Sequence, residues 1–160
     1  MIARNNCYYR CLTIWHRIIM ADVAQYFRDN DLFAQHCGIE LLEAAGGSSK
    51  ARMVIQKHHL NGIGTVHGGV IFTLADYAFA SACNSHGTVA VAINCSISYV
   101  KPSSTGVLTA TARETSLGGR IGTYAIDITD ENGCLIAIFQ GMAYRKKETM
   151  DDLIKMKAQH

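Results

Sequence analysis

Apolar residues first recur at helical spacing between Asp22 and His36. The positions concerned are Val23, Tyr26, Phe27 and Phe33. Gly38 follows shortly afterwards, and glycine is a common residue just past the end of a helix. The pattern therefore predicts one short helix near the N-terminus.

A longer helix is predicted from Val70 to Cys83, a stretch that is rich in Ala and contains neither Gly nor Pro. Residues 61–69, which precede it, contain four glycines and have the composition of a loop. The apolar positions of the helix cover several faces, at Ile71, Leu74, Ala75, Ala78 and Ala82 and also at Val70, Phe72 and Phe79. Because a helix that is apolar on all sides is normally buried, this one is expected to lie in the core.

Short apolar runs separated by turn residues predict six strands. Residues 39–45 and 50–56 flank a Gly-Gly-Ser-Ser turn and are expected to form a hairpin. Four β-rich segments follow the central helix, at residues 89–99, 107–116, 121–129 and 134–144, with turns at 117–120 and 130–133. Since strands and helices do not alternate, we expect an α+β fold in which an antiparallel sheet wraps around the central helix. Residues 145–160 are charged and are expected to be a frayed helix or a tail.

Length, charge and hydropathy narrow the class of protein. The 160 residues suit one domain. The formal charge of +2, from 15 Lys and Arg against 13 Asp and Glu, includes no long run of either sign, so nucleic-acid binding is not expected. No apolar run reaches the ~18 to 20 residues of a membrane-spanning helix, so no membrane partner is expected.

The cysteines lack paired short spacings and are expected to be reduced, as in a cytoplasmic protein. They are Cys7, Cys11, Cys37, Cys83, Cys95 and Cys134. Cys7, Cys11 and His16 could be considered as a metal cluster, but no second pair completes a zinc site, so no metal is expected. Residues 1–19 precede Met20 and a helix-start pattern, and we interpret them as an upstream extension or a disordered tail.

Asp76 is the first candidate for chemistry, because it lies in the middle of the predicted buried helix. A buried carboxylate is costly unless it is paired or hydrogen-bonded, and the sequence contains no Lys or Arg between Lys57 and Lys101. Two interpretations stay open from the residues alone. Asp76 is either a functional group or a structural acid whose hydrogen bonds are satisfied.

The glycines at the helix start favour the functional interpretation. Gly68 and Gly69 leave backbone N–H groups unobstructed where the helix dipole is positive, which is the geometry of an oxyanion hole. Asn61 and His58 could supply further donors, although Asn61 beside a glycine is also a common turn former. For His67 we favour a loop anchor that hydrogen-bonds backbone over a direct contact with substrate.

These residues carry a resemblance to a known family. The segment from His58 through Asn61, His67-Gly68-Gly69 and Asp76 to Ser85 resembles the hotdog-fold thioesterases of the PaaI type, which are linked to phenylacetate catabolism. The similarity extends from about residue 22 to about residue 147. It implies a hotdog fold and hydrolysis of an acyl-CoA thioester, with Asp76 as the catalytic carboxylate, the Gly68 amide as the donor to the thioester carbonyl, and Asn61 as an assisting amide.

The resemblance also implies where substrate binds. Its coenzyme A site maps to Ser116, Gly118, Gly119, Arg120 and Lys146, and open amides and cations suit a pyrophosphate and a ribose phosphate. His67 and Gly69 border the reacting group. In some relatives a hydroxyl residue on the strand after the helix holds the water, and Asn94 is the candidate substitute here. Because coenzyme A is part of the substrate, no separate cofactor is expected.

Helix geometry adds an expectation about assembly. Gly68 and Asp76 are eight residues apart, or about 12 Å along one helix, which is too far for both to reach one carbonyl group. Two antiparallel helices related by a two-fold axis would bring Gly68 of one copy to Asp76 of the other. We therefore expect a homo-oligomer, and specifically a dimer of dimers. Within each chain, residues 21–147 are expected to form the thioesterase domain, residues 1–20 an extension or disordered tail, and residues 148–160 a charged tail.

Two other functions are weighed against hydrolysis. A hydratase or dehydratase on the same fold would need a second acid or histidine, which the sequence does not arrange beside Asp76. A non-catalytic acyl-CoA sensor would need an attached DNA-reading module, and the residues before Ile39 are too few for one. The acyl group stays open: Phe72, Tyr77, Phe79 and Tyr99 suit an aryl or medium-chain group, or serve as core.

Overall fold

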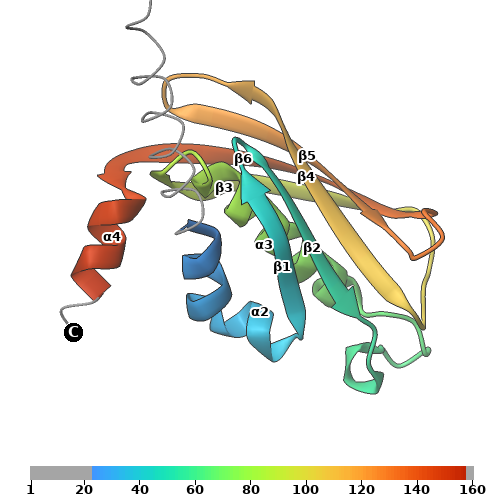
Figure 1. Cartoon of the computed structure of the whole chain (residues 1–160). Coiled ribbons are helices and arrows are strands. Elements are labelled where there is room, and N and C mark those ends of the chain that lie inside the picture. Colours follow the sequence, from blue (N-terminus) through green and yellow to red (C-terminus); the bar gives the residue numbers. More distant parts are fainter. Residues whose placement is uncertain (1–22, 158–160) are drawn as a thin grey trace, which may run out of the picture.

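The computed structural model describes residues 23–157, and Figure 1 shows their course. Residues 23–30 are helical. The elements that follow are α2 (Leu32–His36), β1 (Ile39–Ala45), β2 (Ser48–Val54), the 3-10 turn η1 (Lys57–His59), α3 (Gly68–Asn84), β3 (Thr88–Tyr99), β4 (Val107–Leu117), β5 (Ile121–Thr129), β6 (Leu135–Thr149) and α4 (Met150–Lys157). The predicted order of a helix, two strands, a central helix and four strands is confirmed.

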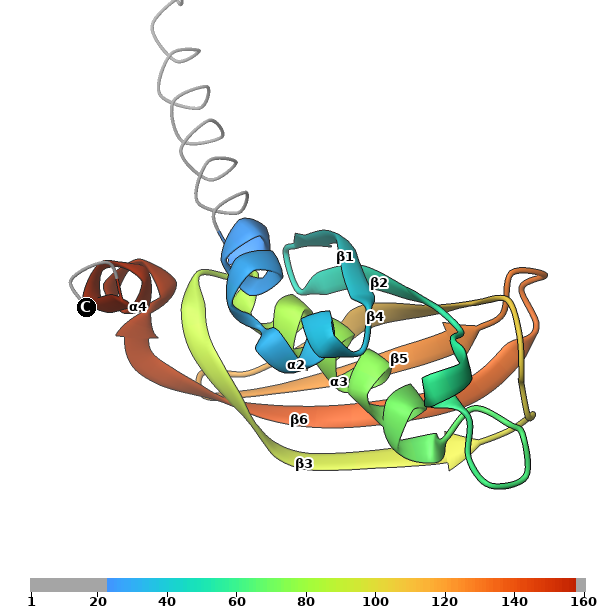
Figure 2. The ribbon, with the colours of Figure 1, turned by 90° about the horizontal axis from the view of Figure 1, so that it is seen from below.

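The six strands form one antiparallel sheet in the order β1-β2-β4-β5-β6-β3. The sheet curls around α3, which runs along its inner face (Figures 1 and 2). The strand that follows α3 in the chain, β3, pairs with the last strand and lies at an edge. This is the hotdog fold that the resemblance implies. Its topology leaves the outer side of β3 without a strand partner among residues 23–157.

The apolar face of α3 and the concave face of the sheet make the core. Four apolar residues of α3 are 0% exposed, namely Leu74, Ala75, Ala78 and Ala82. The ring of Phe79 lies between Tyr124 and Phe139, with centroid distances of 5.4 and 5.9 Å. Gly141 of β6 is needed for this packing, because a Cβ there would lie 2.8 Å from Cε2 and Cζ of Phe79. The prediction of a buried central helix is confirmed.

The N-terminal helix differs from the prediction. The pattern predicts one helix from Asp22 to His36, but the helical residues 23–30 and α2 are separated at Asp31. The Asp31 side chain caps α2 by accepting a hydrogen bond from Ala34 N at 2.9 Å. Hydrophobic spacing does not register such a break, because the apolar positions stay in phase across it.

The C-terminal region is also more regular than expected. Residues 145–149 continue β6, and Met150–Lys157 form α4. The helix starts with a cap, since Thr149 Oγ1 donates to Asp152 Oδ2 at 2.7 Å and accepts from Asp152 N at 3.2 Å. Met150 is buried, and its N–H donates to Gly87 O at 2.9 Å. Within residues 23–157, none of the helices has both the length and the apolar character needed to cross a bilayer. Cys7, Cys11 and His16, which were considered and rejected as a metal cluster, lie outside the described residues, as does the expected upstream extension.

Candidate active site

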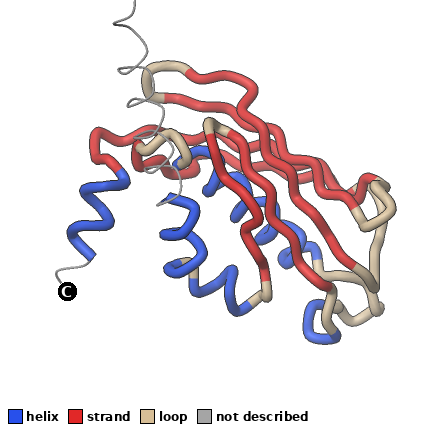
Figure 3. Tube along the Cα trace, viewed as in Figure 1, coloured by secondary structure: helices blue, strands red, loops and turns tan. Residues whose placement is uncertain are grey.

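The loop between η1 and α3 lies at one end of the sheet (Figure 3) and is held by its own hydrogen bonds. Asn61 Oδ1 accepts from Ile63 N at 3.0 Å and from Thr65 N at 3.2 Å, while Asn61 Nδ2 donates to Thr65 Oγ1 at 2.9 Å. Leu60 and Val66 close the loop as an antiparallel bridge. In this geometry Asn61 acts as a turn former, which was one of its two interpretations. Its assistance to a substrate carbonyl stays a prediction.

His67 is the N-cap of α3 and organises its first turn. His67 Nδ1 accepts from Gly69 N at 2.9 Å, and His67 O accepts from Val70 N and Ile71 N. This is the backbone-anchoring role that we favoured from sequence. The amide of Gly68 differs from its neighbours, because no acceptor for it lies among the described residues. The first turn of α3 thus presents one unengaged N–H at the positive end of the helix dipole.

Tyr99, at the end of β3, covers this N-terminal turn. Its hydroxyl donates to Gly68 O at 2.8 Å, and a Cβ on Gly68 would lie 2.9 Å from that hydroxyl oxygen. Glycine therefore lets the tyrosine ring lie against the backbone. A cavity of about 340 Å³ opens beside Gly68, with Lys101 on its wall. Its other lining residues are Thr65, Val66, Ile71, Tyr99, Val100, Pro102 and Ser103.

Asp76 borders a second cavity, of about 350 Å³, further along α3. Its carboxylate accepts no hydrogen bond and forms no ion pair with any residue from 23 to 157, so the interpretation as a satisfied structural acid loses its basis. Burial raises the pKa of the Asp76 carboxyl, and the Asp31 carboxylate raises it further. The lining of this cavity is mainly apolar, from Tyr26, Phe27, Phe79, Ala80, Cys83, Asn84, Val89, Ala90, Val91, Ala92, Met150 and Leu153.

The two candidate catalytic groups do not meet within one chain. The cavities beside Gly68 and Asp76 share no lining residue. Eight residues of one helix separate Gly68 from Asp76, which corresponds to about 12 Å. The opposite ends of β3 border the two cavities, Val89–Ala92 beside Asp76 and Tyr99 beside Gly68. Within one chain, the two candidate groups therefore border separate cavities.

The candidate phosphate-binding residues gather at the β4–β5 turn and on β6. Arg120 Nη1 donates to Tyr144 Oη at 2.9 Å, and Lys146 is exposed two residues further along β6. Tyr144 pairs with Ile121 on one side and with Val91 on the other. Since neighbouring strands lie about 4.8 Å apart, the turn is about 10 Å from the wall of the Asp76 cavity. Ser116, Gly118 and Gly119 are exposed in the same turn.

Asn94 lies elsewhere on β3. It lines a hollow of about 280 Å³ together with Ser96, Thr115, Thr123 and Gln140, and it is not among the residues that border Asp76. That Asn94 replaces a hydroxyl group that holds the water stays a prediction. Its position away from the Asp76 cavity does not favour that role within one chain. Of the aromatic residues considered for the acyl group, Phe79 lines the Asp76 cavity and Tyr99 the Gly68 cavity. The rings of Phe72 and Tyr77 pack against Phe139 and Phe27, respectively.

Among the lining residues of the Asp76 cavity that sequence reasoning missed are residues from outside the sheet and α3. Tyr26 and Phe27 come from the N-terminal helical residues, and Met150 and Leu153 come from α4. The apolar spacing of residues 150–156 was visible in the sequence, but it did not indicate what α4 covers. Sheet topology was needed, because β6 carries α4 to the edge where β3 begins.

Comparisons with known proteins identify the family of the chain. Residues 63–137 match the family model of the thioesterase superfamily. The chain is 39% identical over 118 residues to acyl-coenzyme A thioesterase PaaI of Escherichia coli. The matched region covers 73% of this chain and 84% of that protein. The chain is also 33% identical over 103 residues to acyl-coenzyme A thioesterase 13 of Homo sapiens. That match covers 62% of this chain and 74% of the human protein.

Solved structures extend the likeness to three dimensions. The structure of the E. coli PaaI protein from the phenylacetic acid degradation operon superposes with a TM-score of 0.79 at 36% identity, covering 82% of this chain and 96% of that one. A structure of phenylacetic acid degradation protein PaaI from Thermus thermophilus superposes with a TM-score of 0.68 at 36% identity, covering 71% of this chain and 98% of that one.

Proposed function

The chain belongs to the PaaI-type acyl-CoA thioesterases of the thioesterase superfamily, and we propose that it hydrolyses aryl- or medium-chain acyl-CoA at a site shared by two copies. The products are the free acid and coenzyme A. In each site Asp76 of one copy acts on a thioester whose carbonyl oxygen lies at the Gly68 amide of the other. We place the enzyme in the cytoplasm, which the unpaired state of the cysteines among residues 23–157 supports.

The single observation that carries this proposal is the carboxylate of Asp76, which lies in a mainly apolar cavity without a hydrogen-bond or ion-pair partner among residues 23–157. A raised pKa brings a carboxylate closer to the basicity that a general base needs at neutral pH. In that role Asp76 takes a proton from water while the water oxygen attacks the carbonyl carbon. The carbon–sulfur bond then breaks, and the departing thiolate receives the proton. As a nucleophile, Asp76 would instead form a mixed anhydride and release the thiolate before water hydrolyses the anhydride.

The amide of Gly68 supplies the complementary half. Negative charge develops on the carbonyl oxygen during attack, and a fixed N–H at a helix N-terminus stabilises that charge without reorganisation. The carbonyl oxygen must approach this donor to about 3 Å while the carbon lies near a carboxylate. A distance of about 12 Å along one helix excludes a pairing within one chain, so the pairing across a two-fold axis is the one that fits.

The open edge of β3 is suited to that pairing. It is a strand of 12 residues whose outer side has no strand partner among the described residues. Val91 and Ile93 are exposed on it, and both cavities border this strand. Long exposed edges are usually covered or paired. We therefore propose a dimer joined along β3, with a dimer of dimers as the larger assembly.

Arg120 and Lys146 are proposed to bind the phosphates of coenzyme A. Both are exposed cations without a carboxylate partner among residues 23–157, and the turn beside them offers the amides of Gly118 and Gly119. Cations and open amides are the usual ligands of pyrophosphate. Their Ala variants should raise KM mainly, and the effect should shrink at high salt.

The function is tested with a panel of acyl-CoA thioesters, from acetyl to palmitoyl together with phenylacetyl and benzoyl, assayed for thiol release. The Asp76→Asn variant should lower kcat by at least ~10²-fold. Since burial disfavours the charged carboxylate, the neutral amide should keep or raise the melting temperature at neutral pH. Near-normal turnover by a well-folded Asp76→Asn variant would exclude the proposed role. Single-turnover hydrolysis in 18O water, with mass analysis of the Asp76 peptide, separates base from nucleophile.

The shared site is tested by mixing two inactive variants. Asp76→Asn subunits combined with Gly68→Pro subunits give mixed dimers in which one of the two sites is intact. Random pairing makes half of the dimers mixed, so roughly a quarter of the wild-type activity should return. No recovery from demonstrably mixed dimers would show that each site is built within one chain.

A further inference from the structure

The cavity beside Asp76 follows α3 away from the Gly68 end. Its α3 lining residues are Asp76, Phe79, Ala80, Cys83 and Asn84, which share one stripe of the helix surface. From Asp76 to Asn84 the stripe is about 12 Å long. Because the lining is mainly apolar, a thioester carbonyl placed at Asp76 would direct its acyl group along this stripe, and the phosphate-bearing coenzyme A would remain outside.

The outer wall of the cavity comes from two segments that lie outside the curled sheet and its central helix. Tyr26 and Phe27 belong to the helical residues 23–30, while Met150 and Leu153 belong to α4. Lys157 connects these segments, with its Nζ 5.3 Å from the centroid of the Tyr26 ring. Figures 1 and 2 show α4 at the end of the molecule where β3 begins. The part of the wall that α4 supplies is therefore a docked helix with contacts at both of its ends.

The two α4 residues in the wall have different roles. Met150 is 1% exposed and anchors the start of the helix, so its truncation would disturb folding. Leu153 is half-buried and lies one turn further along, at a position where a change of size alters the cavity more than the core. The next residue, Ile154, is also half-buried but does not line the cavity. The pair offers an isomeric control on the same helix.

We propose that α4 sets the length of acyl group that the enzyme accepts, with Leu153 as the specificity-determining side chain at the outer wall of the Asp76 cavity. This inference rests on the proposed thioesterase function and deepens it. Acyl groups of medium length or a single aryl ring occupy the space between Asp76 and α4. Longer acyl chains contact Leu153, so the size of this side chain limits the length of the acyl group that the cavity accepts.

The test compares Leu153→Ala, Leu153→Trp and Ile154→Ala with the wild type. For each, kcat/KM is measured over acyl-CoA chains of increasing length and for phenylacetyl-CoA. Leu153→Ala should move the optimum to longer chains, and Leu153→Trp should move it to shorter ones. Because one methylene in an apolar pocket changes discrimination by about 10-fold or more, the ratio of long-chain to short-chain kcat/KM should change by at least about 10-fold in opposite directions. Ile154→Ala should leave the profile unchanged.

A second measurement separates this inference from the thioesterase proposal. Equilibrium binding of non-hydrolysable S-alkyl-CoA thioethers of graded length reports the cavity whether or not turnover occurs. If the wild type hydrolyses no acyl-CoA, the proposed function fails, and the thioether series still decides the role of α4. The inference is overturned if both Leu153 variants, with melting temperatures near that of the wild type, keep the wild-type length preference in turnover and in binding, or if Ile154→Ala shifts it equally.

Discussion

The residues that begin and end α3 differ in how their hydrogen-bonding groups are engaged. At the C-terminal end, Asn84 accepts from Ala90 N at 2.8 Å and donates to Ala90 O at 3.1 Å, which fixes the start of β3. Ser85 Oγ accepts from Gly47 N at 2.8 Å and donates to Ala82 O at 2.7 Å. At the N-terminal end, the Gly68 amide has no acceptor among the described residues.

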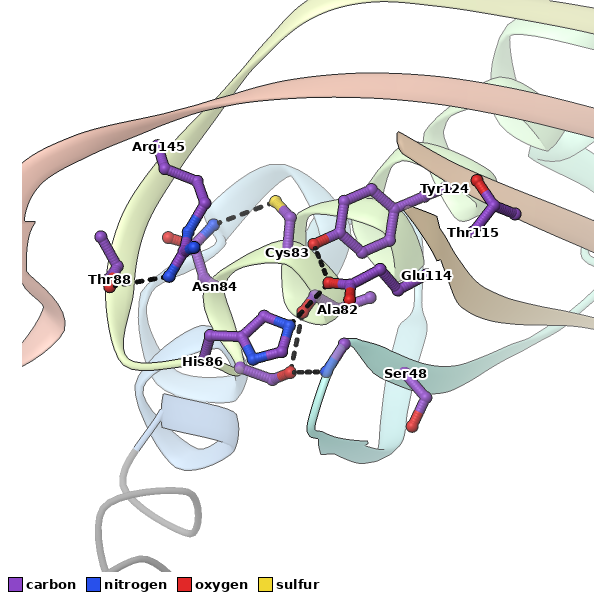
Figure 4. A network of polar contacts seen from close by, with 12 residues as sticks. Ser48, Ala82, Cys83, Asn84, His86, Thr88, Glu114, Thr115, Tyr124 and Arg145 are labelled. Atoms are coloured by element: carbon purple, nitrogen blue, oxygen red, sulfur yellow. Dashed lines mark hydrogen bonds and ion pairs between the residues drawn. The ribbon is translucent and has the colours of Figure 1, made fainter. Parts of the chain in front are cut away.

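A network beyond the C-terminal end strengthens the contrast (Figure 4). Glu114 of β4 lies between His86 and Tyr124, at 2.7 Å from His86 Nε2 and 2.8 Å from the Tyr124 hydroxyl. These contacts connect the end of α3 to two strands of the sheet. Saturation of this kind stabilises a fold, whereas an unengaged donor at a positive helix terminus is available to a substrate. This difference is what the proposed role of the Gly68 amide as an oxyanion donor requires.

The largest effect on this comparison is expected from removing the Gly68 N–H, which has no acceptor among the described residues. Gly68→Pro deletes the N–H at the first helical position, where proline is well tolerated, and His67 already has the extended conformation that a residue before proline adopts. Losing a donor to the developing oxyanion should lower kcat by about 10²- to 10³-fold. Steady-state hydrolysis of the best acyl-CoA measures the effect.

Gly68→Ala is the matched control, because it adds the Cβ that meets Tyr99 but keeps the N–H. Its loss of activity should be much smaller than that of the proline variant. Equal losses would mean that the steric change at Tyr99, and not the amide, determines the rate, and the contrast between the two ends of α3 would then lose its functional meaning.

A substitution at the C-terminal end of α3 should lower the stability of the fold and leave the rate of hydrolysis unchanged. Ser85→Ala leaves the buried Gly47 N–H without its acceptor, and Ser85 is itself 1% exposed. An unsatisfied buried donor costs about 1–3 kcal/mol, so the free energy of unfolding should fall by that amount. Denaturant titration measures it, while kcat at a temperature well below unfolding should stay near the wild-type value. A large kcat defect in folded Ser85→Ala would contradict the purely structural role of this end.

Much of this organisation was predictable from local patterns, because spacing and turn chemistry act over a few residues. The bounds of β1 and β5 agree with the predicted segments, and α3 begins two residues earlier than Val70 because glycines are admitted to its first turn. The break at Asp31 and the extension of β6 to Thr149 were not predicted. Both depend on a side-chain cap or on strand pairing with distant residues, which a periodicity does not contain.

The candidate site shows the same division. Asp76 and the Gly68 amide were identified from an acid in an apolar helix and from glycines at its start, and both are local signals. Tyr99 was considered from sequence for its aromatic character, but its contact with Gly68 spans 31 positions of the chain. Leu153 lines the Asp76 cavity because the strand order places β6, and with it α4, beside β3. Contacts of this kind follow from topology, which hydrophobic spacing does not determine.

At the N-terminal end of α3, a substitution of Tyr99 should have a smaller effect than a substitution of Gly68. Tyr99→Phe keeps the ring against Gly68 but removes the hydroxyl that donates to Gly68 O at 2.8 Å. One lost hydrogen bond corresponds to about 0.5–1.5 kcal/mol, so kcat should fall by about 2- to 10-fold with little change in KM. Tyr144→Phe is a useful counterpart, since its hydroxyl contacts Arg120 and its loss should alter KM instead. The reverse assignment of kcat and KM effects would refute the positioning role of Tyr99.

The smallest expected effect concerns acid sensitivity at the same end of α3. His59 is 2% exposed, its Nδ1 accepts from Gln56 N at 3.0 Å, and its carbonyl accepts from His67 N at 2.8 Å. Burial lowers the pKa of His59 below its usual 6.5; the neighbouring His58 lowers it further, while the Cys37 carbonyl opposes both. The fold therefore favours the neutral ring, and this contribution to stability is complete above pH 6.5 and is lost as the pH falls from 6.5 through the lower folded pKa.

His59→Asn retains an acceptor near the position of Nδ1 and cannot titrate, so it should be less sensitive to acid than the wild type. Melting temperatures measured at pH 7.5 and pH 5.5 give the drop for each protein, and the drop should be smaller in the variant by a few degrees at most. All other residues are the same in both proteins, so the difference between the two drops isolates His59. Equal drops would show that the ring accepts a proton in the fold as readily as in the unfolded chain.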